Sequence, residues 1–82
     1  MNDEMRKLRE YLNAKGIKWQ DVSDDGDYPI TRTHFKVKRQ RWSVIFGFGT
    51  YGSQHGLLEL MIGNNDPAGW LTADDVIKRI EK

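Results

Sequence analysis

The sequence predicts a small α+β domain in which an N-terminal and a C-terminal helix pack on one face of a three-stranded antiparallel sheet. Three observations lead to this prediction: an apolar stripe with helical spacing near the N-terminus, alternating apolar and polar residues between positions 31 and 62, and a capping residue followed by acids at position 72. The element order is therefore α-β-β-β-α, with a fourth strand possible over residues 17–22. Two amphipathic helices and a sheet with one apolar face suffice to close a two-layer core.

Length and composition indicate one globular domain over residues 1–82. The chain is 38% hydrophobic and 30% charged, which supplies one small core and is too apolar for a disordered protein. It contains no cysteine, so disulfides, thiolate catalysis and cysteine-based metal sites are excluded. No apolar run reaches the roughly 18 residues of a membrane span, and the first residues do not resemble a secretory signal. We therefore expect a cytoplasmic protein without membrane contact.

The first helix is expected over about residues 3–15. Its apolar stripe consists of residues spaced by three or four positions, which are Met1, Met5, Leu8 and Leu12. Asn2 is a suitable N-cap, and Gly16 can adopt the left-handed conformation that ends a helix. The last helix is expected to begin after the cap Thr72, with a buried stripe formed by Ala73, Val76, Ile77 and Ile80. Residues 64–69 have the composition of a loop.

Three sequential strands are expected between the helices. Alternation predicts that one side of each strand faces the core: Thr33, Phe35 and Val37, then Trp42, Val44, Phe46 and Phe48, then Leu58, Leu60 and Ile62. A polar connection over residues 38–41 separates the first two strands. Sequential strands most simply pair as an antiparallel meander.

The opposite side of this sheet is expected to be both basic and apolar. Five of the thirteen basic residues fall between positions 32 and 41, with no acid among them. An uncovered face of this kind is a candidate partner-binding site, formed by Arg32, His34, Lys36, Lys38, Ile45, Leu57 and Met61. Two structural explanations compete with this one: the segment 17–29 covers the face, or the lysine row protects a sheet edge.

A glycine-rich loop follows the second strand. Gly47, Gly49 and Gly52 match the spacing G-x-G-x-x-G, but a strand instead of a helix follows, so a dinucleotide site is not predicted. The simplest interpretation is a wide hairpin connection. The alternative is an anion-binding or nucleotide-binding loop formed by Gly47, Gly49, Thr50, Tyr51, Gly52 and Ser53.

Catalytic and metal-binding patterns are lacking. The two histidines, His34 and His55, lie far apart in sequence, whereas a catalytic zinc site needs three protein ligands. The acidic stretch after Asp21 partly matches a calcium loop, but Arg32 stands where a glutamate is required. No nucleophile has an adjacent acid–base pair in a known motif. We therefore expect no enzyme activity, no metal and no cofactor.

Three segments carry a resemblance to known sequences. The stretches 44–52, 56–59 and 69–77 together resemble short uncharacterised proteins encoded by phages and prophages of Gram-positive bacteria. This resemblance implies a small accessory protein of phage origin in the host cytoplasm, and it assigns no role to any residue.

Two hypotheses of function follow. The first is a non-catalytic binding module that contacts a protein partner with an acidic rim through the open sheet face. The second is a nucleic-acid or anionic-ligand binder that uses the basic strand 32–41 and the loop 47–56; it predicts binding that weakens steeply with salt. Sheet faces that bind nucleic acid expose aromatic rings, and here the strand aromatics are expected to point inward. Like-charged rows would oppose face-to-face pairing, so we expect a monomer or a weak homodimer.

Overall fold

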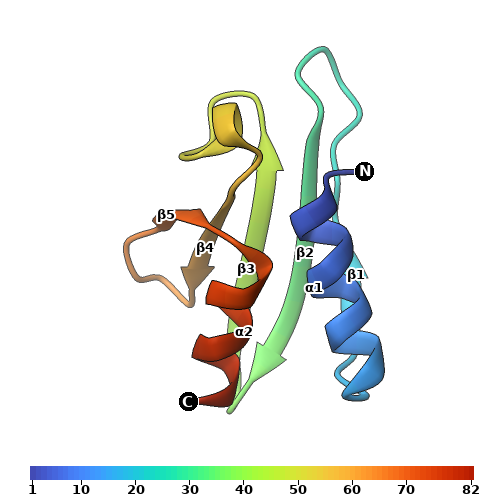
Figure 1. The fold of residues 1–82 in the computed structure, drawn as a ribbon, viewed down its shortest axis with the longest axis vertical. Coiled ribbons are helices and arrows are strands. Elements are labelled where there is room, and N and C mark those ends of the chain that lie inside the picture. Colours follow the sequence, from blue (N-terminus) through green and yellow to red (C-terminus); the bar gives the residue numbers. More distant parts are fainter.

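A five-stranded antiparallel sheet and two helices form two layers in the computed structural model, which describes residues 1–82 (Figure 1). The elements in chain order are α1 (Asp3–Ala14), β1 (Trp19–Asp21), β2 (Ile30–Val37), β3 (Gln40–Gly47), the short 3-10 helix η1 (Ser53–His55), β4 (Leu58–Ile62), β5 (Ala68–Leu71) and α2 (Ala73–Glu81). The strands lie in the order β1-β2-β3-β4-β5, so the sheet is a meander. Both helices cover the same face. The α+β prediction is confirmed, but three or four strands were too few.

Helix α1 forms where the sequence predicted it, because both ends are determined locally. The Asn2 side chain accepts a hydrogen bond from the Met5 amide at 2.9 Å, and Gly16 is left-handed with φ of +71°. Met5, Leu8 and Leu12 are fully buried. Met1, in contrast, is 73% exposed, so the buried stripe begins one turn later than expected.

Strand β1 shows where the segment after α1 lies relative to the sheet. It pairs antiparallel with β2, with Trp19 opposite Phe35 and Asp21 opposite Thr33. The segment therefore extends the edge of the sheet in its own plane and does not lie across the face away from the helices.

The β2–β3 hairpin turns on two residues, Lys38 and Arg39, which have φ of +51° and +71°. Positive φ at both central residues gives the turn a twist that matches a hairpin, although glycine or asparagine usually occupies these positions. Lys38 does not lie on the outward face as predicted, because it belongs to this turn and its Nζ donates to the Lys82 carbonyl oxygen at the end of α2. The expected core position of Phe48 is also wrong: β3 ends at Gly47, and the Phe48 side chain is 75% exposed.

Strand β5 occupies residues that were in part expected to form a loop. It pairs with β4 through Leu58 opposite Leu71 and Leu60 opposite Ala68, with an irregular register between these pairs. Trp70 within it has a left-handed φ of +62°, which explains why no alternation marks this strand. Helix α2 follows with the predicted cap: Thr72 and Asp75 form a reciprocal capping box.

The core lies between the sheet and the helices. Its eleven buried hydrophobic residues are Met5, Leu8, Leu12, Phe35, Trp42, Val44, Leu58, Leu60, Leu71, Ala73 and Val76. Arg9 and Thr33 are buried with them, and the Arg9 Nε donates to the Thr33 hydroxyl at 2.8 Å. Phe46 is only half-buried at the margin of this cluster. Neither helix has the length and apolar character needed to cross a membrane.

Candidate functional site

The outer sheet face is the side of the sheet that neither helix covers (Figure 1). Strand register places its residues in adjacent rows. Arg32, Ile45 and Glu59 form one row, His34, Ser43 and Met61 form the next, and Lys36 lies opposite Arg41 in the third. Their chain neighbours on these strands, such as Thr33, Phe35 and Val44, point into the core. Five of the predicted site residues therefore share one face: Arg32, His34, Lys36, Ile45 and Met61.

Two predicted residues lie elsewhere. Lys38 is in the hairpin turn and contacts the end of α2. Leu57 precedes β4 and is half-buried beside the glycine loop, where its amide donates to the Gly52 carbonyl oxygen. The apolar part of the outer sheet face is therefore formed by Ile45, which is half-buried, and Met61, which is 38% exposed.

The cations of the outer sheet face have no counter-ion within the protein. The three ion pairs of the molecule are Arg6–Asp3, Lys7–Glu4 and Arg9–Asp21, so Arg32, Lys36 and Arg41 take part in none. Burial lowers the pKa of His34, and the charges of Arg41 and Arg32 lower it further. The face thus presents three cations outside any ion pair, with one carboxylate, Glu59, in the row of Arg32.

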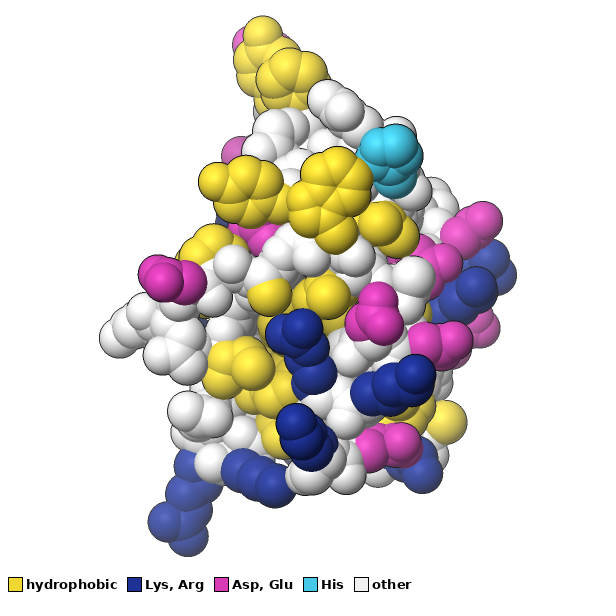
Figure 2. Space-filling model, turned by 60° about the vertical axis from the view of Figure 1, so that its left-hand side comes forward, with side chains coloured by type: hydrophobic (Ala, Val, Ile, Leu, Met, Phe, Trp, Pro, Cys, Tyr) yellow, Lys and Arg dark blue, Asp and Glu magenta, His cyan; other side chains and the backbone are white.

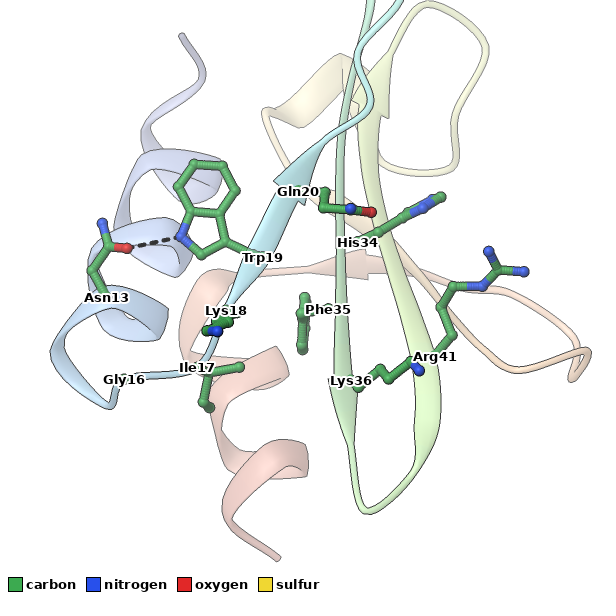
Figure 3. A pocket seen from close by; sticks show the side chains of 10 residues that line it. All are labelled: Asn13, Gly16, Ile17, Lys18, Trp19, Gln20, His34, Phe35, Lys36 and Arg41. Carbon is green, nitrogen blue, oxygen red and sulfur yellow. Dashed lines mark hydrogen bonds between the residues drawn. The ribbon is translucent and has the colours of Figure 1, made fainter.

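An open groove of about 980 Å³ adjoins this face where α1 leads into β1 (Figure 3). Figure 3 shows Trp19 turned toward α1, where its indole nitrogen donates to the Asn13 side chain at 2.9 Å, while Gln20 and His34 point to the other side of the sheet. The lining contains Lys18, Lys36 and Arg41 but no acidic residue.

Lys18 and Gln20 were not predicted to belong to a site, and Arg41 was predicted only as part of the basic strand 32–41 of the alternative function. Arg41 could have been found from the sequence if the hairpin turn had been recognised as two residues long. It then falls within β3 one position before the buried Trp42, and alternation directs its side chain outward. Lys18 and Gln20 depended on the strand at 17–22 being placed at the edge of the sheet, which the sequence left open.

The glycine loop is more ordered than a wide connection would be. Its backbone amides are largely engaged: Gly47 donates to the Thr50 hydroxyl, Thr50 to the Gly47 carbonyl, and Ser53 to the Thr50 carbonyl. The Tyr51 amide donates to the Glu59 carboxylate at 2.8 Å. The residues of the alternative anion site, from Gly47 to Ser53, do lie together. The amides of Gly47, Thr50, Tyr51 and Ser53 are engaged within the protein, those of Gly49 and Gly52 are not, and the Glu59 carboxylate stands beside them. This arrangement does not favour an anion.

Four exposed aromatic side chains gather at the end of the molecule where this loop lies. We call this surface the aromatic end; it consists of Tyr28, Phe48, Tyr51 and Trp70, which are between 56% and 75% exposed. Tyr28 stacks on Phe48 with ring centroids 5.1 Å apart, and His55 lies 5.2 Å from Trp70. A shallow hollow of about 290 Å³ is lined by Phe48, Tyr51 and Trp70 among others. Figure 2 shows hydrophobic side chains gathered at this upper end, with a histidine beside them.

No cluster of three or more histidine, aspartate or glutamate side chains is placed to hold a metal ion. In comparisons with known proteins, the chain matches no family model, no curated protein and no solved structure. The arrangement of its own residues is therefore what a proposal of function has to rest on.

Proposed function

We propose that this protein is a non-catalytic binding module that contacts a protein partner through its outer sheet face. The observation that carries the proposal is the pairing of apolar side chains with cations that have no counter-ion, on a face that neither helix covers. Ile45 and Met61 are diagonal neighbours on adjacent strands, and Arg32, Lys36 and Arg41 lie beside them. A partner with an apolar centre and an acidic rim would bury the first group and neutralise the second.

A nucleic acid fits the outer sheet face less well. Proteins that bind single strands on a sheet stack the bases on exposed aromatic rings. Here Trp42 and Phe35 are buried on the helix side, and Trp19 turns toward α1. The face offers cations for phosphates, but its one aromatic ring is the imidazole of His34, which is half-buried.

The resemblance to phage and prophage proteins gives the proposal a setting. We propose accordingly that the partner is a phage or host protein and that the two proteins meet in the host cytoplasm. Self-association through the same face is disfavoured, because two copies would bring like-charged rows together with Glu59 as the acidic residue between them. We therefore propose a monomer that meets a different protein.

The proposal is tested with variants of the face. Ile45→Asp places a charge at the centre of the apolar pair, and the double variant Lys36→Glu and Arg41→Glu reverses the cationic part. Lys82→Glu is the matched control, because this exposed residue lies at the end of α2 on the helix side. Each protein is immobilised and incubated with host lysate, retained proteins are quantified by mass spectrometry, and folding is checked by thermal denaturation.

A partner retained by the wild type and by Lys82→Glu, but lost with Ile45→Asp at an unchanged melting temperature, supports the proposal. Unfolding of Ile45→Asp would show that Ile45 belongs to the core, and the proposed face would not exist. A third measurement uses a thymidine oligonucleotide. Binding that falls by orders of magnitude between about 50 and 200 mM salt, and that is lost in the double variant, would favour the nucleic-acid alternative instead.

A further inference from the structure

We infer that the aromatic end is a second binding surface, and that its occupant is an arginine- or lysine-bearing segment of another protein. This surface lies beyond the outer sheet face of the proposed function. It is built from two loops that emerge at the same end of the sheet, the connection between β1 and β2 and the glycine loop after β3, together with Trp70 of β5 (Figure 1).

The rings of the aromatic end are held in place by the backbone beneath them. A Cβ atom at Gly52 would lie 2.9 Å from the Trp70 Cα atom, and one at Gly69 would overlap Tyr51, so both glycines permit a close approach of the loop to β5. The Trp70 amide donates to the Tyr51 carbonyl oxygen, and Trp70 itself has a left-handed φ of +62°. A tryptophan held in a rare conformation with half of its surface in water is typical of a functional position.

The loop before Tyr28 is acidic, whereas the glycine loop contains neither acidic residues nor lysine or arginine. No lysine or arginine occurs between residues 19 and 31 or between residues 42 and 77. The first loop carries Asp24, Asp25 and Asp27 directly before Tyr28, and Glu59 lies beneath Tyr51. The opposite end of the molecule is cationic, and most of the Lys and Arg side chains visible in Figure 2 lie in its lower half.

The exposed rings and the nearby carboxylates together indicate that a cationic group binds here. The faces of aromatic rings attract guanidinium and ammonium groups, and nearby carboxylates add to that attraction. The protein already contains one such contact, since the Arg9 guanidinium lies 4.6 Å from the centre of the Trp19 ring and pairs with Asp21. A nucleic acid would also stack on exposed rings, but its phosphates would be repelled by the three aspartates of the loop. A basic protein segment can therefore place its cations over the rings and be attracted by the carboxylates at the same time.

The probe for the test is an eight-residue peptide of alternating arginine and glycine, compared with the same peptide carrying glutamate in place of arginine. Binding is followed by the chemical shifts of the Trp70 indole and of the amides at 24–28 and 47–56. We expect saturable shifts at these positions with the arginine peptide and none with the glutamate peptide. Phe48→Leu keeps the apolar volume but removes the ring face, and it should weaken binding by about threefold to tenfold.

Charge is tested separately from the rings. Asp25→Asn combined with Asp27→Asn should weaken peptide binding by about threefold or more, because two negative charges are removed. The side-chain hydrogen bond of this loop is made by Asp24, so the change does not break it. The matched control is Asp66→Asn in the loop before β5, which should leave the affinity unchanged within about twofold. Ile45→Asp on the outer sheet face should also have no effect, so failure here and failure of the proposed function can be told apart.

Three results would overturn the inference. The first is equal binding of the glutamate peptide or of a thymidine oligonucleotide at the Trp70 indole. The second is an affinity for the arginine peptide that Phe48→Leu and the double aspartate variant leave unchanged. The third is a shift of the Trp70 indole with protein concentration alone that disappears in Lys36→Glu, since the occupant would then be the cationic face of a second copy.

Discussion

Tyr51 lies so close to Gly69 that a Cβ atom at position 69 would overlap the Cβ atom of Tyr51. Gly69 does not have a positive φ, so its role is to leave space and not to adopt a special conformation. The contact joins the glycine loop to β5 across two segments that are far apart in sequence. It is what allows Tyr51 and Trp70 to stand side by side at the aromatic end.

Gly69→Ala should therefore destabilise the fold for a purely steric reason. Inserting a methyl group into this contact is expected to lower the free energy of unfolding by about 1–3 kcal/mol. Chemical denaturation measures the change. The control is Gly26→Ala, whose added Cβ would meet its nearest neighbour, Asp24 Oδ1, at an ordinary 3.4 Å, and which should change stability by less than about 0.5 kcal/mol. Equal stability of the two variants would show that the loop does not pack on β5.

Phe46 and Phe48 provide a second test, because alternation assigned both to the core. Phe46 is half-buried against the core, whereas Phe48 is exposed beyond the end of β3. Phe46→Ala should cost about 2 kcal/mol, less than the roughly 3–5 kcal/mol typical of a fully buried phenylalanine. Phe48→Ala should cost less than about 0.5 kcal/mol. Thermal denaturation compares the two, and a larger loss for Phe48 would contradict the position at which β3 ends.

The parts of the fold that the sequence predicted correctly are those determined locally. Asn2, Gly16 and Thr72 act on their own neighbours, so both helices were placed nearly to the residue. Strands β1 and β5 are only three and four residues long and lie at the sheet edges. Alternation made β1 a possible strand over residues 17–22, whereas β5 has no local alternation and is defined by its pairing with β4.

The candidate site was predicted in part for the same reason. Period-two alternation placed Arg32, His34 and Ile45 on one face, and the register confirms it. A connection was predicted over residues 38–41, but its restriction to Lys38 and Arg39 could not be predicted, because neither residue favours a positive φ. The aromatic end depends on where β3 stops. Gly47, the last residue of β3, packs against a distant segment, because a Cβ atom there would lie 2.8 Å from the Pro29 carbonyl oxygen.

Arg9 is a buried cation whose three contacts need a planar, forked group. Its Nε donates to Thr33 at 2.8 Å, its Nη2 reaches Asp21 at 3.3 Å, and its guanidinium lies over the Trp19 ring. Lysine cannot make all three contacts at once, so Arg9→Lys should lower the free energy of unfolding by about 1–3 kcal/mol. Arg6→Lys, at an exposed pair with Asp3, should change it by less than about 0.5 kcal/mol. Similar losses in the two variants would mean that the buried contacts add no stability.

His34 should make the free energy of unfolding depend on pH between about pH 7.5 and pH 5. The carboxylates with a lowered pKa titrate at more acidic pH. Burial and the charges of Arg41 and Arg32 lower its pKa in the folded protein, whereas an unfolded histidine titrates near pH 6.5. The unfolded chain therefore binds more protons below about pH 6.5, and the free energy of unfolding should fall as the pH is lowered until His34 also protonates in the folded state. The pKa values of Asp21 and Asp75 are lowered from 3.8 by hydrogen bonds from Ser23 and Thr72, so the stability they contribute is lost only at more acidic pH. Denaturation midpoints measured between pH 7.5 and pH 5 should show the slope in the wild type and in His55→Gln, and a flatter profile in His34→Gln. A full slope in His34→Gln would show that His34 is not the source of the pH dependence.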